Sequence, residues 1–191
     1  FASFVLVNTW SLKRTPGTLR WSSGVTTSPE QKFAAALMNY RSLHGRYPTH
    51  PLDLAADLKM TLPLLSPYTS LDAAKVGDTT LATMGDLMTT EQIAALVTAL
   101  PPSPTPSAGD VTLLCPGLAM ATSPPTLWVA CIRGPASTAP VPGFTFTSAT
   151  LVLADGSLTP APNLEGEDFT EQQALRQSLG LAPLPPLSSW R

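Results

Sequence analysis

The chain has 191 residues, enough for one domain with a sizeable hydrophobic core. Only 13% of them are charged and the formal net charge is −2, so the sequence lacks the basic stripe that nucleic-acid binding needs and the polybasic cluster that anionic membranes attract. Its 21 prolines are about twice the usual number and, with abundant Ser and Thr, predict many turns. Hydroxyl- and Pro-rich loops also suit O-glycosylation, and the composition is typical of extracellular proteins.

The chain opens with a short apolar segment, FASFVLVNTWSL at 1–12. It is too short to cross a bilayer, which needs about 20 apolar residues, and it fits neither a helical nor a strand period cleanly. Alone in water it would expose a large apolar patch, so we expect it to pack against another surface. We therefore divide the chain into an apolar arm and linker at 1–28, serving assembly, and one globular domain at 29–191. The arm residues expected to make this contact are Phe1, Phe4, Val5, Leu6, Val7 and Trp10.

The best-specified element is a helix over 29–44. Ser28 is a suitable N-cap, Pro29 suits the first helical position, and Gln31 completes a capping box. Gly45 is a natural left-handed stop, and Pro48 prevents the helix from restarting. Apolar residues recur at spacings of three and four, which predicts one buried face. That face consists of Phe33, Ala36, Leu37, Tyr40 and Leu43.

A long irregular insert follows and leads into strand-like sequence. The insert is expected to hold a helical turn or two at 53–59, a loop at 61–70, a short turn at 80–87, a helix at 90–100 capped by Thr90, and a polyproline-like connector at 101–109. Strands are then predicted at 111–115 and 126–132, a hairpin at 143–162 turning at Asp155-Gly156, and a last helix at 170–179 ended by Gly180. The fold class is α+β, with the first helix lying on a small antiparallel sheet and a short helix at the C-terminus.

Two cysteines, Cys115 and Cys131, lie in neighbouring strand-like runs. Facing one another across a hairpin, they would close a small loop worth about 3 kcal/mol, and a disulfide would imply an oxidising compartment. The alternative is two buried free thiols. Neither cysteine belongs to a CxxC pair or a His/Cys cluster, which disfavours zinc and haem.

Candidate catalytic groups are few. His44 and His50 lack helical register and have no acidic or cysteine cluster beside them, so surface or packing roles are favoured over a metal pair. Glu165, Glu167 and Asp168 form a small acidic cluster in a predicted loop, which either is simply solvated or binds Ca²⁺. No nucleophile elbow or phosphate loop occurs. We therefore expect no catalytic residues, no cofactor and no metal, and a protein that is not an enzyme.

The segment EQKFAAALMNYRSLHGRYPTHPLDLAADL resembles type IV pilins and, more closely, type II secretion pseudopilins. The family pattern A-L-x-x-Y-R-x-x-x-G-x-Y-P-T is present, and its most specific positions here are Tyr40, Gly45, Tyr47 and Pro48. A following antiparallel sheet, a disulfide in the second half and a late Asp-Gly hairpin are also similar to pilin heads. Pilins, however, begin with a continuous hydrophobic helix carrying Glu at the fifth position. Here position 5 is Val5, and Lys13, Arg14, Pro16 and Gly17 interrupt the apolar run.

The resemblance implies a structural subunit of an extracellular filament or pseudopilus at the cell surface, exported through the inner membrane. Its partners would be copies of itself or related pilin subunits, together with an inner-membrane assembly machinery. A second hypothesis is another extracellular or virion assembly subunit, in which residues 1–12 are donated as a β-strand to a neighbour. A third is a small secreted enzyme or carbohydrate-binding module, for which His44, His50 and the 165–168 cluster are the available titratable groups.

Overall fold

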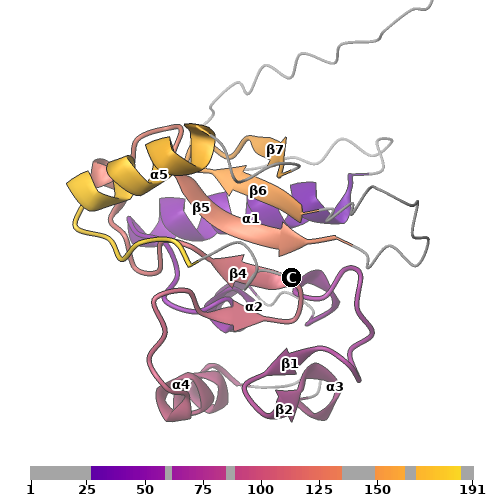
Figure 1. Cartoon of the computed structure of the whole chain (residues 1–191). Helices are drawn as coiled ribbons and strands as arrows, with labels where there is room; N and C mark the ends of the chain where they lie inside the picture. Colours follow the sequence, from indigo (N-terminus) through magenta and orange to yellow (C-terminus); the bar gives the residue numbers. More distant parts are fainter. Residues whose placement is uncertain (1–26, 59–61, 85–88, 135–148, 162–166, 186–191) are drawn as a thin grey trace, which may run out of the picture.

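The computed structural model describes residues 27–58, 62–84, 89–134, 149–161 and 167–185 (Figure 1). The predicted arm at 1–12 lies outside these residues. The fold is α+β: an N-terminal helix, a five-stranded antiparallel sheet and a C-terminal helix. In chain order the elements are α1 (Pro29–His44), α2 (Leu52–Leu58), η1 (Leu62–Leu64), β1 (Lys75–Val76), β2 (Thr79–Thr80), α3 (Leu81–Met84), α4 (Thr90–Ala99), β3 (Ser107–Ala108), β4 (Val111–Leu113), η2 (Met120–Thr122), β5 (Trp128–Arg133), β6 (Ala149–Leu153), β7 (Leu158–Pro160) and α5 (Glu167–Ser178).

Helix α1 begins and ends where the sequence predicts. The Ser28 hydroxyl accepts from the Gln31 N–H, and the Gln31 side chain accepts from the Ser28 N–H, so the capping box is confirmed. Gly45 ends the helix at φ 68°, a left-handed conformation that a side chain would strain. The predicted face is right in part: Phe33, Leu37 and Tyr40 are buried, whereas Leu43 is 64% exposed.

The insert contains more regular structure than predicted. A short hairpin, β1–β2, with two residues in each strand, forms where no strand was expected. Helix α4 is confirmed, but its capping box is formed by Thr89 and Gln92, so the predicted cap at Thr90 is wrong by one residue. These elements lie together at the bottom of Figure 1, below the main sheet.

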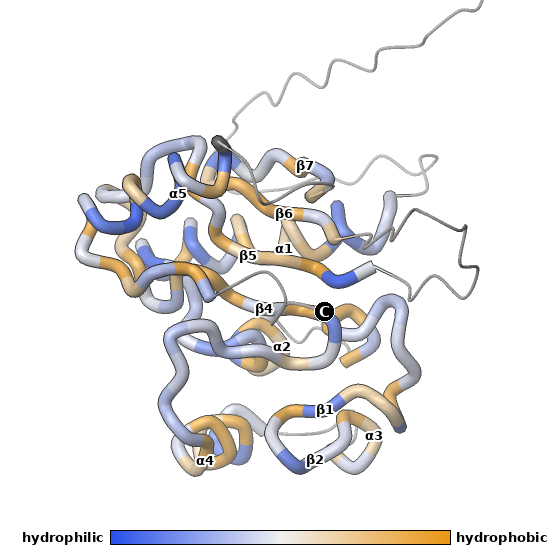
Figure 2. The backbone as a smooth tube through the Cα atoms, viewed as in Figure 1, coloured by the Kyte–Doolittle hydropathy of each residue, from blue (hydrophilic) through white to orange (hydrophobic). Residues whose placement is uncertain are grey.

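The main sheet is an antiparallel meander in the order β3-β4-β5-β6-β7. Five of the six residues of its central strand β5 are buried, and much of this strand is apolar (Figure 2). The Asp155-Gly156 turn is confirmed: Leu153 N–H donates to Ser157 O at 2.9 Å, and Gly156 has φ 88°. Helix α1 contacts β7 and passes behind β5 and β6 in the view of Figure 1.

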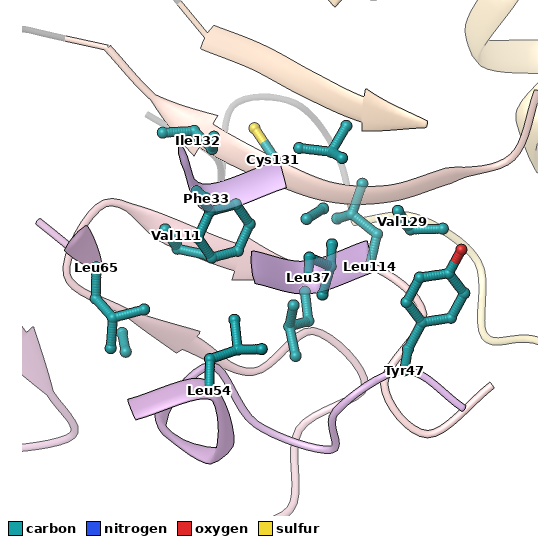
Figure 3. Packing of buried hydrophobic residues seen from close by; sticks show 14 of the residues in the cluster. Phe33, Leu37, Tyr47, Leu54, Leu65, Val111, Leu114, Val129, Cys131 and Ile132 are labelled. Carbon is teal, nitrogen blue, oxygen red and sulfur yellow. The ribbon is translucent and has the colours of Figure 1, made fainter. Parts of the chain in front are cut away.

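One hydrophobic core unites the helices and the sheet (Figure 3). Phe33 and Leu37 of α1 gather there with side chains of β4 and β5, and Leu54 of α2 and Leu65 join from the insert. All four of these side chains have no exposed surface. The insert is therefore part of the same folded unit rather than an appendage.

Helix α5 begins at Glu167, three residues before the predicted Thr170. Glu167 and Asp168 therefore belong to its first turn, and the prediction of an acidic loop is wrong for these two residues. Glu165 lies outside the described residues. After Gly180 the chain reverses, and Leu184 is buried beside the helix.

Candidate functional site

The corner that follows α1 is held by backbone hydrogen bonds to a distant segment. The Gly45 N–H donates to Arg41 O at 2.8 Å, which completes the helix cap. Tyr47 N–H then donates to Leu118 O at 2.9 Å, and Met120 N–H donates to Gly45 O at 2.8 Å. The direction in which the chain leaves α1 is thus fixed from both sides.

Tyr47 folds back against the helix that precedes it. Its ring is 1% exposed, and its hydroxyl accepts a hydrogen bond from Arg41 Nη1 at 2.8 Å. Arg41 Nη1 also donates to the carbonyl of Ala154 in the β6–β7 hairpin, and the guanidinium carbon lies 5.5 Å from the centre of the Tyr47 ring. Burial raises the pKa of Tyr47, although Arg41 opposes the shift. This contact joins the helix corner to the far hairpin.

Four residues of the pattern singled out from the sequence lie in the last turns of α1 or directly after it. Gly45 supplies the cap, Tyr47 and Pro48 are buried behind it, and Tyr40 is buried one turn earlier. The Tyr40 ring stacks at 4.3 Å on the ring of His44. The role of Arg41 in joining Tyr47 to the β6–β7 hairpin was not predicted from the sequence. An Arg one turn before a helix stop is a recognisable signal, since cations are favoured at helix C-termini.

His50 lies in a second corner, between α1 and α2. It is 5% exposed, and its Nδ1 accepts a hydrogen bond from Leu52 N–H at 3.2 Å. Asp53 Oδ2 accepts from the backbone N–H of both Thr49 and His50, each at 2.9 Å, so its carboxylate closes the same turn. Burial lowers the pKa of His50, with Asp53 opposing. His50 is buried and bonded within its own turn, whereas His44 is exposed at the end of α1 with its ring beside that of Tyr40.

The expected disulfide between Cys115 and Cys131 is absent: both thiols are free and buried. Cys131 pairs with Thr112, three residues before Cys115 along the chain. Strand β4 ends at Leu113, so Cys115 lies beyond the paired residues and does not oppose Cys131 across the ladder. The alternative of two buried thiols, which the sequence left open, describes this structure.

The Cys115 thiol lies instead against a buried arginine of α5. Its S–H donates to the Trp128 carbonyl at 3.2 Å, and Arg176 Nη1 donates to its sulfur at 3.3 Å. Arg176 is 1% exposed and also donates from Nε to Ala182 O at 2.8 Å. Burial raises the pKa of Cys115 to about 11 despite the nearby guanidinium, so this thiol is not a nucleophile near neutral pH. Burial raises the pKa of Cys131 to about 12, so this thiol is still less reactive.

Two further polar groups, both missed from the sequence, bind backbone rather than ligands. Gln172 of α5 accepts from Trp128 N–H at 3.0 Å and donates to Thr126 O at 2.9 Å, extending the hydrogen bonding of β5. Asp110 accepts from the backbone N–H of Tyr68 and of Thr69, each at 3.0 Å, and so anchors the loop after η1. A polar residue whose partner is a distant backbone group leaves no local sequence signal.

The described residues contain the polar contacts given above. Their buried polar side chains stabilise corners and strand ends, and no group of three or more His, Cys, Asp or Glu among them could hold a metal. Within the same residues, no helix has both the length and the apolar character of a membrane span. Comparisons with family models, with curated proteins and with solved structures found no match.

Proposed function

We propose that this protein is a pilin-like structural subunit of an extracellular filament or secretion pseudopilus, acting by polymerisation. The observation that carries the proposal is the end of α1. There the family pattern Tyr40, Gly45, Tyr47 and Pro48 corresponds to a physical unit, with Gly45 in the left-handed region and Tyr47 buried beneath Arg41. The order of elements, a first helix, an insert of short helices and a hairpin, and then an antiparallel meander, supports the same reading.

The apolar arm supplies the means of assembly in this proposal. Residues 1–12 carry seven large apolar side chains and no charged one, and burial of each such side chain contributes about 1.5–3 kcal/mol. The partners are copies of the same chain or related subunits, exported through the inner membrane by an assembly machinery. The cell surface is then the place of action.

The alternative of a donated β-strand finds little support at the sheet edges. In β7, Ser157 O and the Ala161 N–H bond to β6, so alternation leaves Leu158 and Pro160 facing the free edge. Pro160 has no N–H to offer an incoming strand. At the opposite edge β3 is two residues long, and the Gly109 N–H beside it donates to Lys75 O of β1. The hypothesis of an enzyme or carbohydrate-binding module is not supported by any cluster of convergent polar groups among the described residues.

The experiment that tests the proposal compares the full chain with a Phe4→Asp/Leu6→Asp variant. Both proteins are examined for filaments by electron microscopy and for large species by sedimentation over a range of concentrations. We expect the full chain to assemble and the variant to remain monomeric and folded. The proposal is refuted if the purified full chain stays monomeric at every concentration and the source cells carry no filaments.

A further inference from the structure

After α5 the chain runs back along the helix as an extended segment of residues 181–185, which we call the strap (Figure 1). The strap belongs to no helix or strand. Pro183 and Pro185 favour its extended form, because proline fixes its own φ at about −65° and disfavours the helical region in the residue before it. The strap leaves α5 at Gly180, which has φ 68° and no atom within 4 Å of an added Cβ. Gly180 is therefore a suitable hinge, about which the strap can turn while α5 stays intact.

Side chains of α5 bind the strap through its backbone. The Gln173 amide donates to Leu184 O at 3.1 Å and accepts from Leu184 N–H at 3.0 Å, so one side chain serves both backbone groups of one residue. Nearly one turn further along α5, Arg176 Nε donates to Ala182 O at 2.8 Å. The strap itself contributes the Leu184 side chain, which is 4% exposed. A segment held by so few contacts opens locally, without unfolding of the whole domain.

Arg176 connects the strap to the Cys115 thiol. Its Nη1 donates to Cys115 Sγ at 3.3 Å while its Nε holds Ala182 O, so the guanidinium bridges the thiol and the strap. Both of these partners are neutral groups, and a buried charge with neutral partners is costly because it has lost its hydration. Release of the strap returns the guanidinium towards water. The desolvation of Arg176 therefore opposes the contacts that close the strap.

We propose that the strap is a latch, hinged at Gly180, whose opening as a unit controls access to the Cys115 thiol. With the strap closed, Cys115 has no exposed surface, and burial raises its pKa to about 11. With the strap open, Arg176 loses its Ala182 partner and is free to move, so Cys115 meets water beside a guanidinium. A neighbouring Arg lowers the pKa of an accessible thiol and favours the reactive thiolate. Strap opening thus converts an inert thiol into a reactive one.

The second cysteine is buried in a different way and provides the comparison. Cys131 lies in β5, where it pairs with Thr112 of β4 on one side and with Leu151 of β6 on the other. Its exposure requires these strands to separate, which disrupts the core of the domain. The two buried cysteines of one chain therefore become accessible through openings of different size. This inference does not depend on the proposed function.

The first test measures the alkylation rate of each cysteine in the folded full chain. The probe is iodoacetamide, which transfers its carbamoylmethyl group to the thiolate sulfur and releases iodide, and tandem mass spectrometry distinguishes the two sites. Gln173→Ala removes both bonds to Leu184, and Gln177→Ala at an exposed position of the same helix is the control. Both thiols should react slowly in the parent chain. We expect Cys115 to react about tenfold faster or more in Gln173→Ala, because two hydrogen bonds to the strap are lost, and at the parent rate in the control.

The second test measures the size of the opening in the parent chain. Urea favours an opening in proportion to the surface that the opening exposes. At low urea concentrations the alkylation rate of Cys115 should therefore change little, whereas that of Cys131 should rise with the slope of global unfolding. If the Cys115 rate rises as steeply as the Cys131 rate, Cys115 is exposed only by global unfolding and the inference is wrong.

A third pair of variants tests the latch from the side of the strap. Leu184→Ser removes the buried anchor, and Ala182→Ser changes an exposed side chain of the same segment as its control. Faster alkylation of Cys115 in Leu184→Ser, with Ala182→Ser at the parent rate, would support the latch. Parent rates at Cys115 in Gln173→Ala or in Leu184→Ser would overturn it.

Discussion

Replacing Gln172 by leucine should destabilise the protein although it puts an apolar side chain into a buried position. Gln172 is 6% exposed, and its amide serves both Trp128 N–H and Thr126 O. Leucine can serve neither. The Trp128 N–H is buried, and an unsatisfied buried donor costs about 1–3 kcal/mol. Thr126 is exposed, so its carbonyl can turn to water and adds little. We expect the free energy of unfolding to fall by about 2 kcal/mol.

The matched control is Gln177→Leu, the same change on the same helix at an exposed position. Urea unfolding followed by circular dichroism gives the free energy of unfolding and its slope for each protein. The slope should stay constant in both variants, because neither change alters the surface that unfolding exposes. A loss of 2 kcal/mol also lowers Tm by about 4–8 °C in a chain of this size. Equal midpoints for the two variants would refute the view that Gln172 extends the hydrogen bonding of β5.

Three further predictions concern the two corners and the thiols. Burial lowers the pKa of His50, so the folded state binds fewer protons than the unfolded state, in which the pKa of His50 lies near 6.5. The contribution of His50 to the free energy of unfolding should therefore be complete above about pH 6.5 and should decline as the pH falls below it. His50→Asn keeps an acceptor for Leu52 N–H and should flatten this decline in urea titrations at several pH values. Gly45→Ala should lower the free energy of unfolding by about 1 kcal/mol through backbone strain alone, because no atom lies within 4 Å of the added Cβ. Gly45→Asn should lower it less, because Asn tolerates the left-handed conformation better. Equal urea midpoints for the parent chain and both variants would contradict the strain. Cys115 and Cys131 should both react with a thiol reagent in denaturant and resist it when folded, even after purification in air; fewer than two reactive thiols in denaturant would point to a disulfide.

The features that the sequence predicted well depend only on residues that are close together in the chain. The capping box at Ser28, the glycine stop at Gly45 and the Asp155-Gly156 turn each depend on a few consecutive residues. Such signals are complete within a short window, so the bounds of α1 and the position of the hairpin followed directly. The α+β class followed from the order of these elements.

What the sequence could not predict depends on register and on distant backbone. The predicted strands at 111–115 and 126–132 do pair, but the first ends at Leu113 and leaves Cys115 outside it, and whether two cysteines oppose one another is decided by single-residue register. The β1–β2 hairpin has two residues per strand, too few for alternation to show. Arg176 is buried although it sits on a helix of polar character, since its partners are a sulfur and a carbonyl from other segments.

Leu43 was wrongly predicted to be on the buried face of α1, and the cause is geometric. Successive residues of a helix rotate by about 100°, so Phe33, Ala34, Leu37 and Tyr40 cluster around one direction, and Leu43 points about 110° away from it. Spacings of three alone drift around the helix, so a residue can continue the apolar periodicity and still leave the buried face. Leu43 therefore continues the apolar pattern of α1 and is nevertheless 64% exposed.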